Sequence, residues 1–212
     1  MDPEQEKIRR YCQKMGIERL VHFTRMENLA SIQAYGLLGR NSLAARGIEA
    51  AHNDTKRLDG FGDGVCLTIG VPNHKVFFRF RCDYGGDWVV ITLEPRVLWE
   101  RSCLFCWTNA ANGMVASTPE RTLQGVDALG KMFENDRLRW RRKIQRGWTT
   151  DPQAEVVVLN GVGIEYVENV FVQKTMKLEV RDRAISLFGR DIVRYGDAYF
   201  KARKEDYDNP QR

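Results

Sequence analysis

The sequence lacks the features of a membrane-spanning or disulfide-stabilised protein. No apolar run approaches the 18 or more residues that a transmembrane helix needs. The amino-terminal segment 1–7 lacks the basic-then-apolar order of a signal peptide. The 5 cysteines, an odd number at scattered positions, favour reduced thiols over a disulfide framework. We therefore expect a cytoplasmic protein with no membrane partner.

Internal repeats, low-complexity linkers and a glycine-rich dinucleotide fingerprint are also absent from the sequence. At 212 residues and 43% hydrophobic composition, the chain can bury one substantial core. We expect a single domain over residues 1–212, with a core at about 17–172 and a helical carboxy-terminal extension at 173–212. Segments 1–16 and 178–187 have the patterns of amphipathic helices.

Runs of β-branched residues predict strands that alternate irregularly with short helices. The clearest predicted strands are 65–69, 88–93 and 167–172. A regular parallel sheet would need long crossover helices between its strands. The sequence therefore predicts an α+β fold with two small, mainly antiparallel sheets around a cleft and with flanking helices.

A candidate catalytic carboxylate, Glu155, stands where a turn meets a strand. Asp151-Pro152 favours a turn, and the valines that follow Glu155 favour an extended strand. Alternation then puts Gln153 and Glu155 on one strand face, where the amide can hold an acceptor and the carboxylate can stabilise positive charge. The alternative is that Glu155 is a solvated strand residue and Gln153 an ordinary turn residue.

A second polar cluster is predicted near the start of the chain. His22 and Thr24 share one face of a predicted strand, and Asn28 lies in the turn before a short helix that ends at Gly36. Their side chains can bind ribose hydroxyls or a carboxamide. The alternative for His22 is a buried imidazole whose partner is a backbone group.

The segment 137–148 contains six basic residues, two tryptophans and no acid. Guanidinium groups bind phosphates, and unpaired bases stack on indole rings. If this segment is helical, one of its faces carries Arg139, Arg142, Lys143 and Arg146. With Trp148, this face would be a basic ridge that leads to Glu155. The alternative is a solvated helix face.

Two further motifs lie between residues 103 and 112. Cys103 and Cys106 have the spacing of a zinc knuckle or a thiol-exchange pair, but no second knuckle accompanies them, so we expect core cysteines and no metal. The segment 107–112 has small residues and two amides beside an indole. Such a segment can line a pocket for a flat base, with Asn109 as a contact. The alternative is an ordinary helix start.

Together, in this order, these motifs resemble the DarT family of DNA-modifying ADP-ribosyltransferase toxins. The motifs that carry the resemblance are His22-x-Thr24-x-x-x-Asn28-Leu29, Gly36-Leu37, Asn109-Ala110-Ala111 and the segment 149–155 before a hydrophobic strand. The resemblance extends over about residues 17–172. It implies an ADP-ribosyltransferase-like fold around an NAD cleft, transfer of ADP-ribose to a base in single-stranded DNA, and an antitoxin ADP-ribosylhydrolase of the macrodomain or NADAR type.

The resemblance also implies roles for individual residues. Glu155 would be the catalytic glutamate, and the preceding turn with Thr149, Thr150 and Gln153 would face the substrate. His22, Thr24 and Asn28 would contact NAD. The segment 53–57 is similar to the basic stretch that supplies an arginine near the reacting centre, which makes Arg57 the candidate and Lys56 its rival. The alternative is a surface charge cluster.

The chain departs from the thymine-directed members of that family. In place of their Tyr-Val-Pro-Phe-Tyr-Phe and Pro-Arg-Ser-Pro segments it has 65–69 and 71–78. A Gln-x-Glu pair like Gln153-x-Glu155 also occurs in guanine-directed enzymes of the pierisin type. We therefore favour guanine over thymine as the modified base.

The chemistry expected of Glu155 follows from the charge that develops in the reaction. Breaking the nicotinamide glycosidic bond leaves positive charge on the ribose, which a carboxylate stabilises. The same carboxylate can accept the proton that the base loses. Two alternatives stay open: the same transfer, or a 2′-phosphotransfer, on RNA or protein, and a nucleic-acid-binding module without catalysis.

Overall fold

The computed structural model describes residues 1–51 and 60–201. The strands are β1 (Leu20–Arg25), β2 (Val65–Ile69), β3 (Trp88–Leu93), β4 (Cys103–Cys106), β5 (Glu155–Val158), β6 (Val167–Val172) and β7 (Val193–Tyr195). The α-helices are α1 (Pro3–Met15), α2 (Leu29–Tyr35), α3 (Arg40–Ala45), α4 (His74–Tyr84), α5 (Val97–Glu100), α6 (Gly113–Ala116), α7 (Gly125–Lys131), α8 (Asp136–Arg141) and α9 (Leu178–Phe188). Short 3₁₀ turns are η1 (Met26–Asn28), η2 (Glu120–Leu123), η3 (Ile164–Tyr166) and η4 (Ala198–Phe200).

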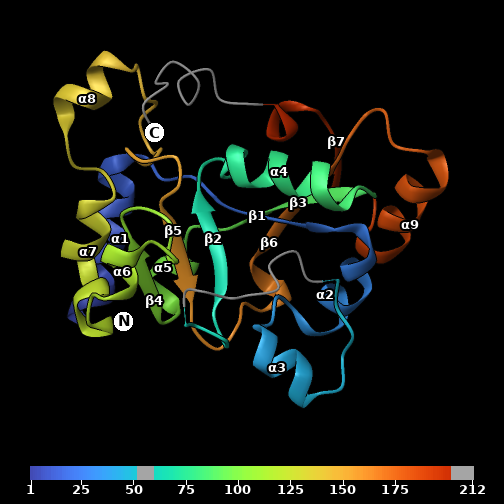
Figure 1. Cartoon of the computed structure of the whole chain (residues 1–212), viewed down its shortest axis with the longest axis horizontal. Helices are drawn as coiled ribbons and strands as arrows, with labels where there is room; N and C mark the ends of the chain where they lie inside the picture. The colour runs from blue at the N-terminus through green and yellow to red at the C-terminus, as the bar shows by residue number, and fades with distance from the viewer. Residues whose placement is uncertain (52–59, 202–212) are drawn as a thin grey trace.

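All the strands belong to one mixed sheet, shown in Figure 1. Its 7 strands have the order β4-β5-β2-β1-β3-β6-β7, and neighbouring strands are antiparallel except β6 and β7, which are parallel. The prediction of two separate sheets is therefore wrong. The physical reason is that β1 pairs with β3 on one side and with β2 on the other, and so joins the two halves.

The join between the two halves is narrow. Strand β1 pairs with β3 along its whole length, from Leu20–Leu93 to Arg25–Trp88. It pairs with β2 only through Leu20–Ile69 and Val21–Thr68. Beyond Val21, β1 and β2 therefore diverge, and the sheet is split at its middle.

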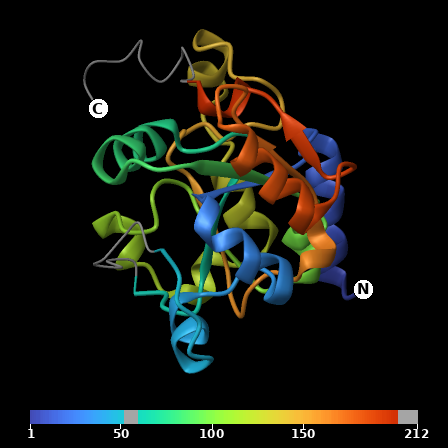
Figure 2. The same cartoon turned by 90° about the vertical axis from the view of Figure 1, so that its right-hand side faces the viewer.

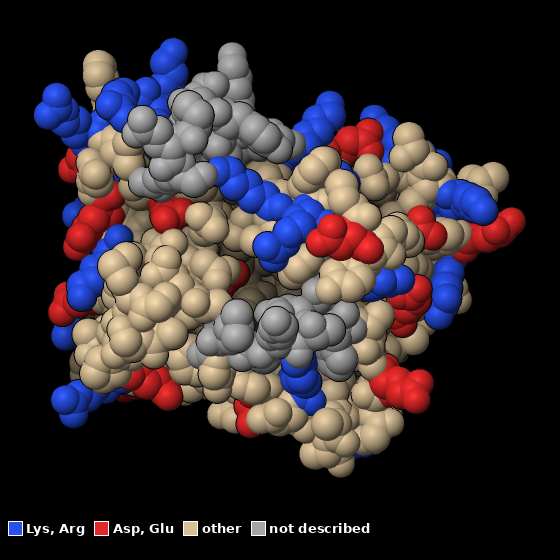
Figure 3. Space-filling model, viewed as in Figure 1, with Lys and Arg blue, Asp and Glu red and all other residues tan. Residues whose placement is uncertain are grey.

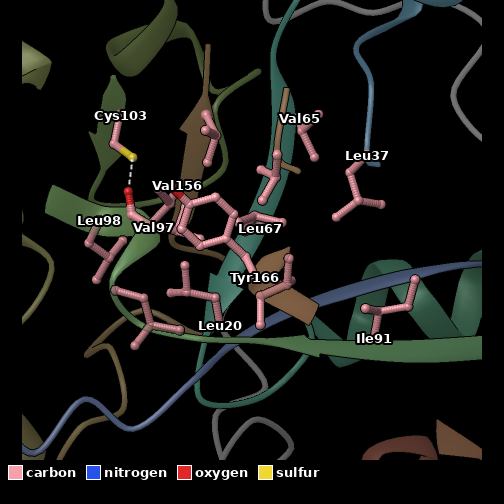
Figure 4. Close-up of a cluster of buried hydrophobic side chains, with 14 of the residues drawn as sticks. Leu20, Leu37, Val65, Leu67, Ile91, Val97, Leu98, Cys103, Val156 and Tyr166 are labelled. Carbon is pink, nitrogen blue, oxygen red and sulfur yellow. Dashed lines mark hydrogen bonds between the residues drawn. The ribbon is translucent and has the colours of Figure 1, made fainter. Parts of the chain in front are cut away.

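The main core covers one face of the sheet. Helices α1, α7 and α9 pack there, and residues such as Ile8, Leu129 and Ala184 are buried against strand residues of alternate positions. In Figure 4, the ring of Tyr166 lies among Leu20, Leu67 and Val156. This face therefore has the hydrophobic cluster that stabilises the fold.

Helix α4 covers part of the opposite face, as Figure 2 shows with α4 and α9 on either side of the strands. Asn73 caps α4, because its side-chain oxygen accepts a hydrogen bond from the backbone N–H of Val76. The ring of Phe77 stacks on Phe23 at 4.5 Å between centroids and packs edge-on against Trp88. This aromatic cluster fixes α4 over β1 and β3.

The Cys103-x-x-Cys106 motif lies in β4, and both of its cysteines are buried. The two side chains belong to different hydrophobic clusters on opposite faces of the sheet. Cys103 Sγ donates to the carbonyl oxygen of Val97, and burial raises the pKa of this thiol to about 12. The geometry therefore does not bring the two sulfur atoms to one metal ion.

The predicted strands at 65–69, 88–93 and 167–172 are confirmed, as are helices within 1–16 and at 178–187. The carboxy-terminal part also contributes β7, which extends the sheet beside β6. No helix of the described residues has the length and apolar character needed to cross a membrane.

Candidate active site

A pocket of about 570 Å³ opens where β1 and β2 diverge. Its walls come from β1, β2, the segments 28–43 and 50–51, the first part of α4 with its cap Asn73, the segment 109–112 and the start of β5. Figure 3 shows a hollow near the centre of this face, with Lys and Arg side chains above it. The split in the sheet therefore creates a binding cleft on the face that carries α4.

Glu155 begins β5, as the sequence predicts, and the turn before it is held by its own side chains. Thr149 Oγ1 donates to the carbonyl oxygen of Asp151 at 2.9 Å, and Asp151 Oδ1 accepts from the backbone N–H of Gln153 at 2.9 Å. Thr149 is buried. Gln153 and Glu155 both line the pocket, two positions apart along the chain.

The carboxylate of Glu155 is held by two donors from the segment after β4. Asn109 Nδ2 donates to Oε1 at 3.0 Å, and the backbone N–H of Ala110 donates to Oε2 at 2.9 Å. The other end of the Asn109 amide accepts from the backbone N–H of Ala111 at 3.0 Å. Asn109 is therefore a positioning residue for Glu155 and also lines the pocket.

His22 lies half-buried at the split in the sheet and lines the pocket. Its Nδ1 lies 3.0 Å from the carbonyl oxygen of Cys66 in β2. A carbonyl oxygen only accepts, so a neutral ring with this bond carries its proton on Nδ1 and a lone pair on Nε2. The ring bridges the two strands at the point where their backbone pairing has ended.

Thr24 and Asn28 also line the pocket and are bonded to each other. Asn28 Nδ2 donates to Thr24 Oγ1 at 2.9 Å and to the carbonyl oxygen of Ala51 at 3.1 Å. Asn28 Oδ1 accepts from the backbone N–H of Ala51 at 2.8 Å. The Asn28 amide therefore fixes the chain at Ala51. Arg57, the predicted catalytic arginine, and its rival Lys56 lie outside the described residues.

The prediction of one helical basic ridge within 137–148 is wrong. Helix α8 ends at Arg141, and the backbone of Lys143 has a φ of 52°, which no right-handed helix contains. Arg139 donates to the carbonyl oxygens of Trp148 at 2.7 Å and Gln145 at 3.3 Å, and to Thr150 Oγ1 at 3.1 Å. Its guanidinium group therefore holds the loop together.

The other predicted nucleic-acid contacts of this segment do not line the Glu155 pocket. Arg146 and Trp148 border a second depression of about 390 Å³, and Arg146 Nη2 donates to the carbonyl oxygen of Lys14. Arg142 and Lys143 follow α8 and lie outside both pocket walls, as do Thr149 and Thr150. The structure thus unites Glu155, Gln153, Asn109, His22, Thr24 and Asn28, and separates them from the basic segment.

The pocket also has a wall that the sequence reading missed. Asn73, Arg79 and Phe80 of the α4 region line it. The signal for Asn73 was present, because an asparagine after a proline and before an amphipathic run is a typical helix cap. The backbone N–H of Ala110 could not be predicted as a donor to Glu155, because every residue type except proline has the same main-chain N–H group.

The carboxylate of Glu155 lies at the edge of a pocket in a split mixed sheet, and comparison with known proteins identifies this arrangement as an ADP-ribosyltransferase-like fold. Residues 21–196 match the model of a family described as "ssDNA thymidine ADP-ribosyltransferase, DarT". This chain belongs to the DarT family. No curated protein matches it.

Solved structures of the family share the fold. The chain is similar to Thermus sp. 2.9 DarT in complex with ADP-ribosylated ssDNA, with 13% identity, a TM-score of 0.63, and coverage of 87% of this chain and 96% of that one. It is similar to Thermus sp. 2.9 DarT in complex with NAD+, with 12% identity, a TM-score of 0.53, and coverage of 86% and 97%. It is also similar to Thermosipho africanus DarTG in complex with ADP-ribose, with 15% identity and a TM-score of 0.57, covering 86% of this chain and 50% of that one.

This family membership confirms the predicted enzyme class. The family is one of ADP-ribosyltransferases, and the similar Thermus sp. 2.9 DarT structure is a complex with NAD+. This chain spans half the length of the Thermosipho chain.

Proposed function

We propose that this protein is a toxin that transfers ADP-ribose from NAD to a base in single-stranded DNA and releases nicotinamide. The observation that carries the proposal is the clamped carboxylate of Glu155, bonded to Asn109 Nδ2 and to the N–H of Ala110 at the wall of the cleft. The family match and the likeness to a DarT structure with ADP-ribosylated ssDNA support it.

In the proposed reaction, Glu155 acts on the nicotinamide ribose. As the glycosidic bond breaks, positive charge develops on the sugar, and the carboxylate stabilises it by binding a ribose hydroxyl. The base that attacks the anomeric carbon loses a proton, which Glu155 accepts. The two donors from Asn109 and Ala110 hold the carboxylate in place, so little reorganisation is needed during the reaction.

His22 and Thr24 are our candidates for NAD contacts, since both line the cleft beside its split strands. Asn28 contributes by a different route. Its amide fixes Ala51, and the next residues lead to Arg57, our candidate for the second catalytic side chain.

We favour guanine as the target base, with thymine as the alternative that the family description names. Gln153 lines the cleft beside Glu155, and its amide has both a donor and an acceptor. Such an amide can pair with the adjacent carbonyl oxygen and ring N–H of guanine, and thymine presents the same two groups, so the choice of guanine rests on the sequence. The Gln153-x-Glu155 pair and the departures at 65–69 and 71–78 support this choice.

The proposed biological setting is a cytoplasmic toxin–antitoxin pair. The likeness to Thermosipho africanus DarTG supports an antitoxin partner, which we propose to be an ADP-ribosylhydrolase of the macrodomain or NADAR type. We propose that the chain is one catalytic domain, because α9 and β7 pack on the sheet that bears the cleft.

Intact-mass analysis of short oligonucleotides tests the proposal. Single-stranded DNA and RNA, each with one guanine or one thymine (uracil in RNA), are incubated with NAD and with the protein or its Glu155→Ala variant. A gain of one ADP-ribose on DNA that the variant loses is the expected result, and the responding oligonucleotide identifies the base. Glu120→Ala, an exposed glutamate away from the cleft, is the matched control.

No gain on any DNA, with NAD intact and the protein folded, would contradict the proposal. A gain of mass on RNA alone would mean that the substrate is RNA and not DNA.

A further inference from the structure

The second depression, of about 390 Å³, has no role in the reaction described above. Its volume lies within the range of about 300–1,000 Å³ that is typical of small-molecule sites. It lies where the end of α1, the residues before β1, the residues after β2, the loop after α8 and the turn η4 meet. No described residue lines both this depression and the cleft, so the two are separate spaces.

The loop that forms one wall of the second depression is held by close contacts. Gly147 has a φ of 82°, and a Cβ atom there would overlap the carbonyl oxygen of Gly16 at the end of α1. A Cβ atom at Gly70 would lie 2.5 Å from Cδ1 of Trp148, so the indole lies directly against the backbone of Gly70. Arg146 Nη2 donates to the carbonyl oxygen of Lys14. The wall is therefore formed before any ligand binds.

The side chains of the second depression combine two aromatic rings with guanidinium groups. Trp148 and Tyr199 are both half-buried and line it from different segments of the chain. The hydroxyl of Tyr199 accepts a hydrogen bond from Arg19 Nη1 at 3.2 Å. Arg19 and Arg146 supply positive charge, and Glu18, the one carboxylate among the described lining residues, has a side chain that is 77% exposed.

This combination suits an unpaired nucleobase. A base stacks on aromatic rings and on guanidinium planes, and its carbonyl oxygens and ring nitrogens accept hydrogen bonds from arginine. The net positive charge of the lining also suits the phosphate that accompanies a base in a nucleotide.

The second depression is next to the cleft along the chain. Val71 lines the depression and Asn73 lines the cleft, so the α-carbons of these two wall residues are at most about 7 Å apart. On the loop before β5, Trp148 lines the depression and Gln153 lines the cleft. A base in the depression can therefore belong to the same strand as a base in the cleft.

We propose that the second depression is a binding site for an unpaired nucleobase, with Trp148 and Tyr199 as its aromatic contacts. The base comes either from a neighbouring nucleotide of the DNA strand or from a free nucleotide. In the first case the inference rests on the proposed function, and the depression contributes to the choice of sequence around the modified base. The site is not the predicted helical ridge, since Arg139, Arg142 and Lys143 do not line it.

Two kinds of substitution test the site. Trp148→Ala removes one ring, whereas Trp148→Phe keeps an aromatic ring at the same position. Ala198→Leu puts a larger side chain into the depression from η4 and deletes no polar group. Ala30→Leu is its matched control, because it makes the same change at an exposed alanine of α2 outside both the cleft and the depression. Thermal unfolding verifies that each variant is folded.

One arm of the experiment measures the binding of single-stranded DNA without NAD. Each base of a short oligonucleotide is replaced in turn by an abasic site. For the wild-type protein, one abasic position should raise the Kd about tenfold, as expected for the loss of one stacked base. Trp148→Ala and Ala198→Leu should weaken binding of the intact oligonucleotide by a similar factor and abolish the effect of that abasic site. Trp148→Phe and Ala30→Leu should preserve it.

The other arm measures the binding of free deoxynucleoside monophosphates against deoxyribose 5-phosphate, which has no base. A nucleotide Kd that Trp148→Ala and Ala198→Leu raise about tenfold, with no binding of deoxyribose 5-phosphate, assigns the site to a free nucleotide. A loss at one abasic position that disappears in the same two variants assigns it to the DNA strand.

The inference would be overturned if neither DNA nor a free nucleotide bound, or if Trp148→Ala and Ala198→Leu left the binding of both unchanged. Weaker binding that did not depend on the base, with abasic and intact oligonucleotides affected equally at every position, would also overturn it. These measurements do not depend on transfer of ADP-ribose. Failure of the proposed reaction would therefore appear in the oligonucleotide masses, and failure of the base site in the binding constants.

Discussion

Two regions with rich functional signals in the sequence, the Glu155 cleft and the basic segment 137–148, differ in what their polar side chains do. In the cleft, Asn109 and the backbone of Ala110 orient a carboxylate that faces the space where a ligand fits. In the basic segment, the guanidinium group of Arg139 donates hydrogen bonds to carbonyl and hydroxyl oxygens of the loop that follows α8. Polar residue types in a sequence therefore predict a binding site only where their polar atoms are not already bonded to the protein's own backbone.

The difference also changes which residues of the basic segment are suited to nucleic acid. Trp140 is 83% exposed, and Arg137 and Arg141 beside it on α8 are also exposed. An exposed indole between guanidinium groups suits the stacking of an unpaired base. The surface that we expect to contact DNA is therefore the outer side of α8 and not the predicted ridge.

The largest expected effect separates the two regions by catalysis. Glu155→Gln removes the charge that stabilises the ribose and the proton acceptor, so single-turnover transfer should fall about 10²-fold or more. Arg139→Ala should leave the rate per folded molecule within about twofold, because Arg139 lies outside the cleft wall. Equal losses of transfer rate in the two variants would mean that the cleft and the basic segment do not differ in their role in catalysis.

The second effect separates them by stability. Arg139→Ala deletes three hydrogen bonds of a partly buried guanidinium group, so the free energy of unfolding should fall by about 1–2 kcal/mol. Arg137→Ala, an exposed neighbour on α8, should change it by less than about 0.5 kcal/mol. Urea unfolding of both variants measures this, and similar midpoints would mean that Arg139 does not hold the loop.

A third effect sharpens the role of the clamp. Asn109→Ala removes one of the two donors to Glu155, which should lower kcat about fivefold, or about 1 kcal/mol, while the KM for NAD changes little. Steady-state kinetics against NAD concentration give this split. A rise in KM with an unchanged kcat would make Asn109 a substrate contact instead of a positioning residue.

The smallest effect concerns the outer side of α8. Arg141→Ala should weaken single-stranded DNA binding slightly and lower the slope of log K against log salt by about 0.7, as expected for one lost phosphate contact. Arg139→Ala should not change that slope. Fluorescence anisotropy of an oligonucleotide at several salt concentrations measures both. A changed slope for Arg139→Ala alone would mean that Arg139, and not the outer side of α8, contacts the DNA.

The sequence predicted the parts of the fold and site that depend on local patterns. The strand at 65–69, the helix at 178–187 and the position of Glu155 at a strand mouth follow from alternation, amphipathic spacing and the Asp151-Pro152 turn. The sequence did not predict that the strands form a single sheet, because only two residue pairs between β1 and β2 join the two halves. Pairing between distant segments leaves no periodic trace in either segment.

The side-chain directions in the basic segment could not be predicted from the sequence for a similar reason. A helical reading of 137–148 needs only the spacing of charges, but Lys143 takes a positive φ and ends that helix early. Where Arg139 points then depends on the loop that it binds. Charge spacing predicts a face only where the element is known to continue.

The early end of pairing between β1 and β2 has a consequence for resistance to inhibitors. Beyond Val21, β1 and β2 no longer pair with each other, and the main-chain carbonyl of Cys66 in β2 is bonded to the ring of His22 at the wall of the cleft. Substitution of a side chain cannot delete a main-chain group. An NAD-site inhibitor that bonds to such groups would therefore be harder to escape by point mutation than one that relies on side chains.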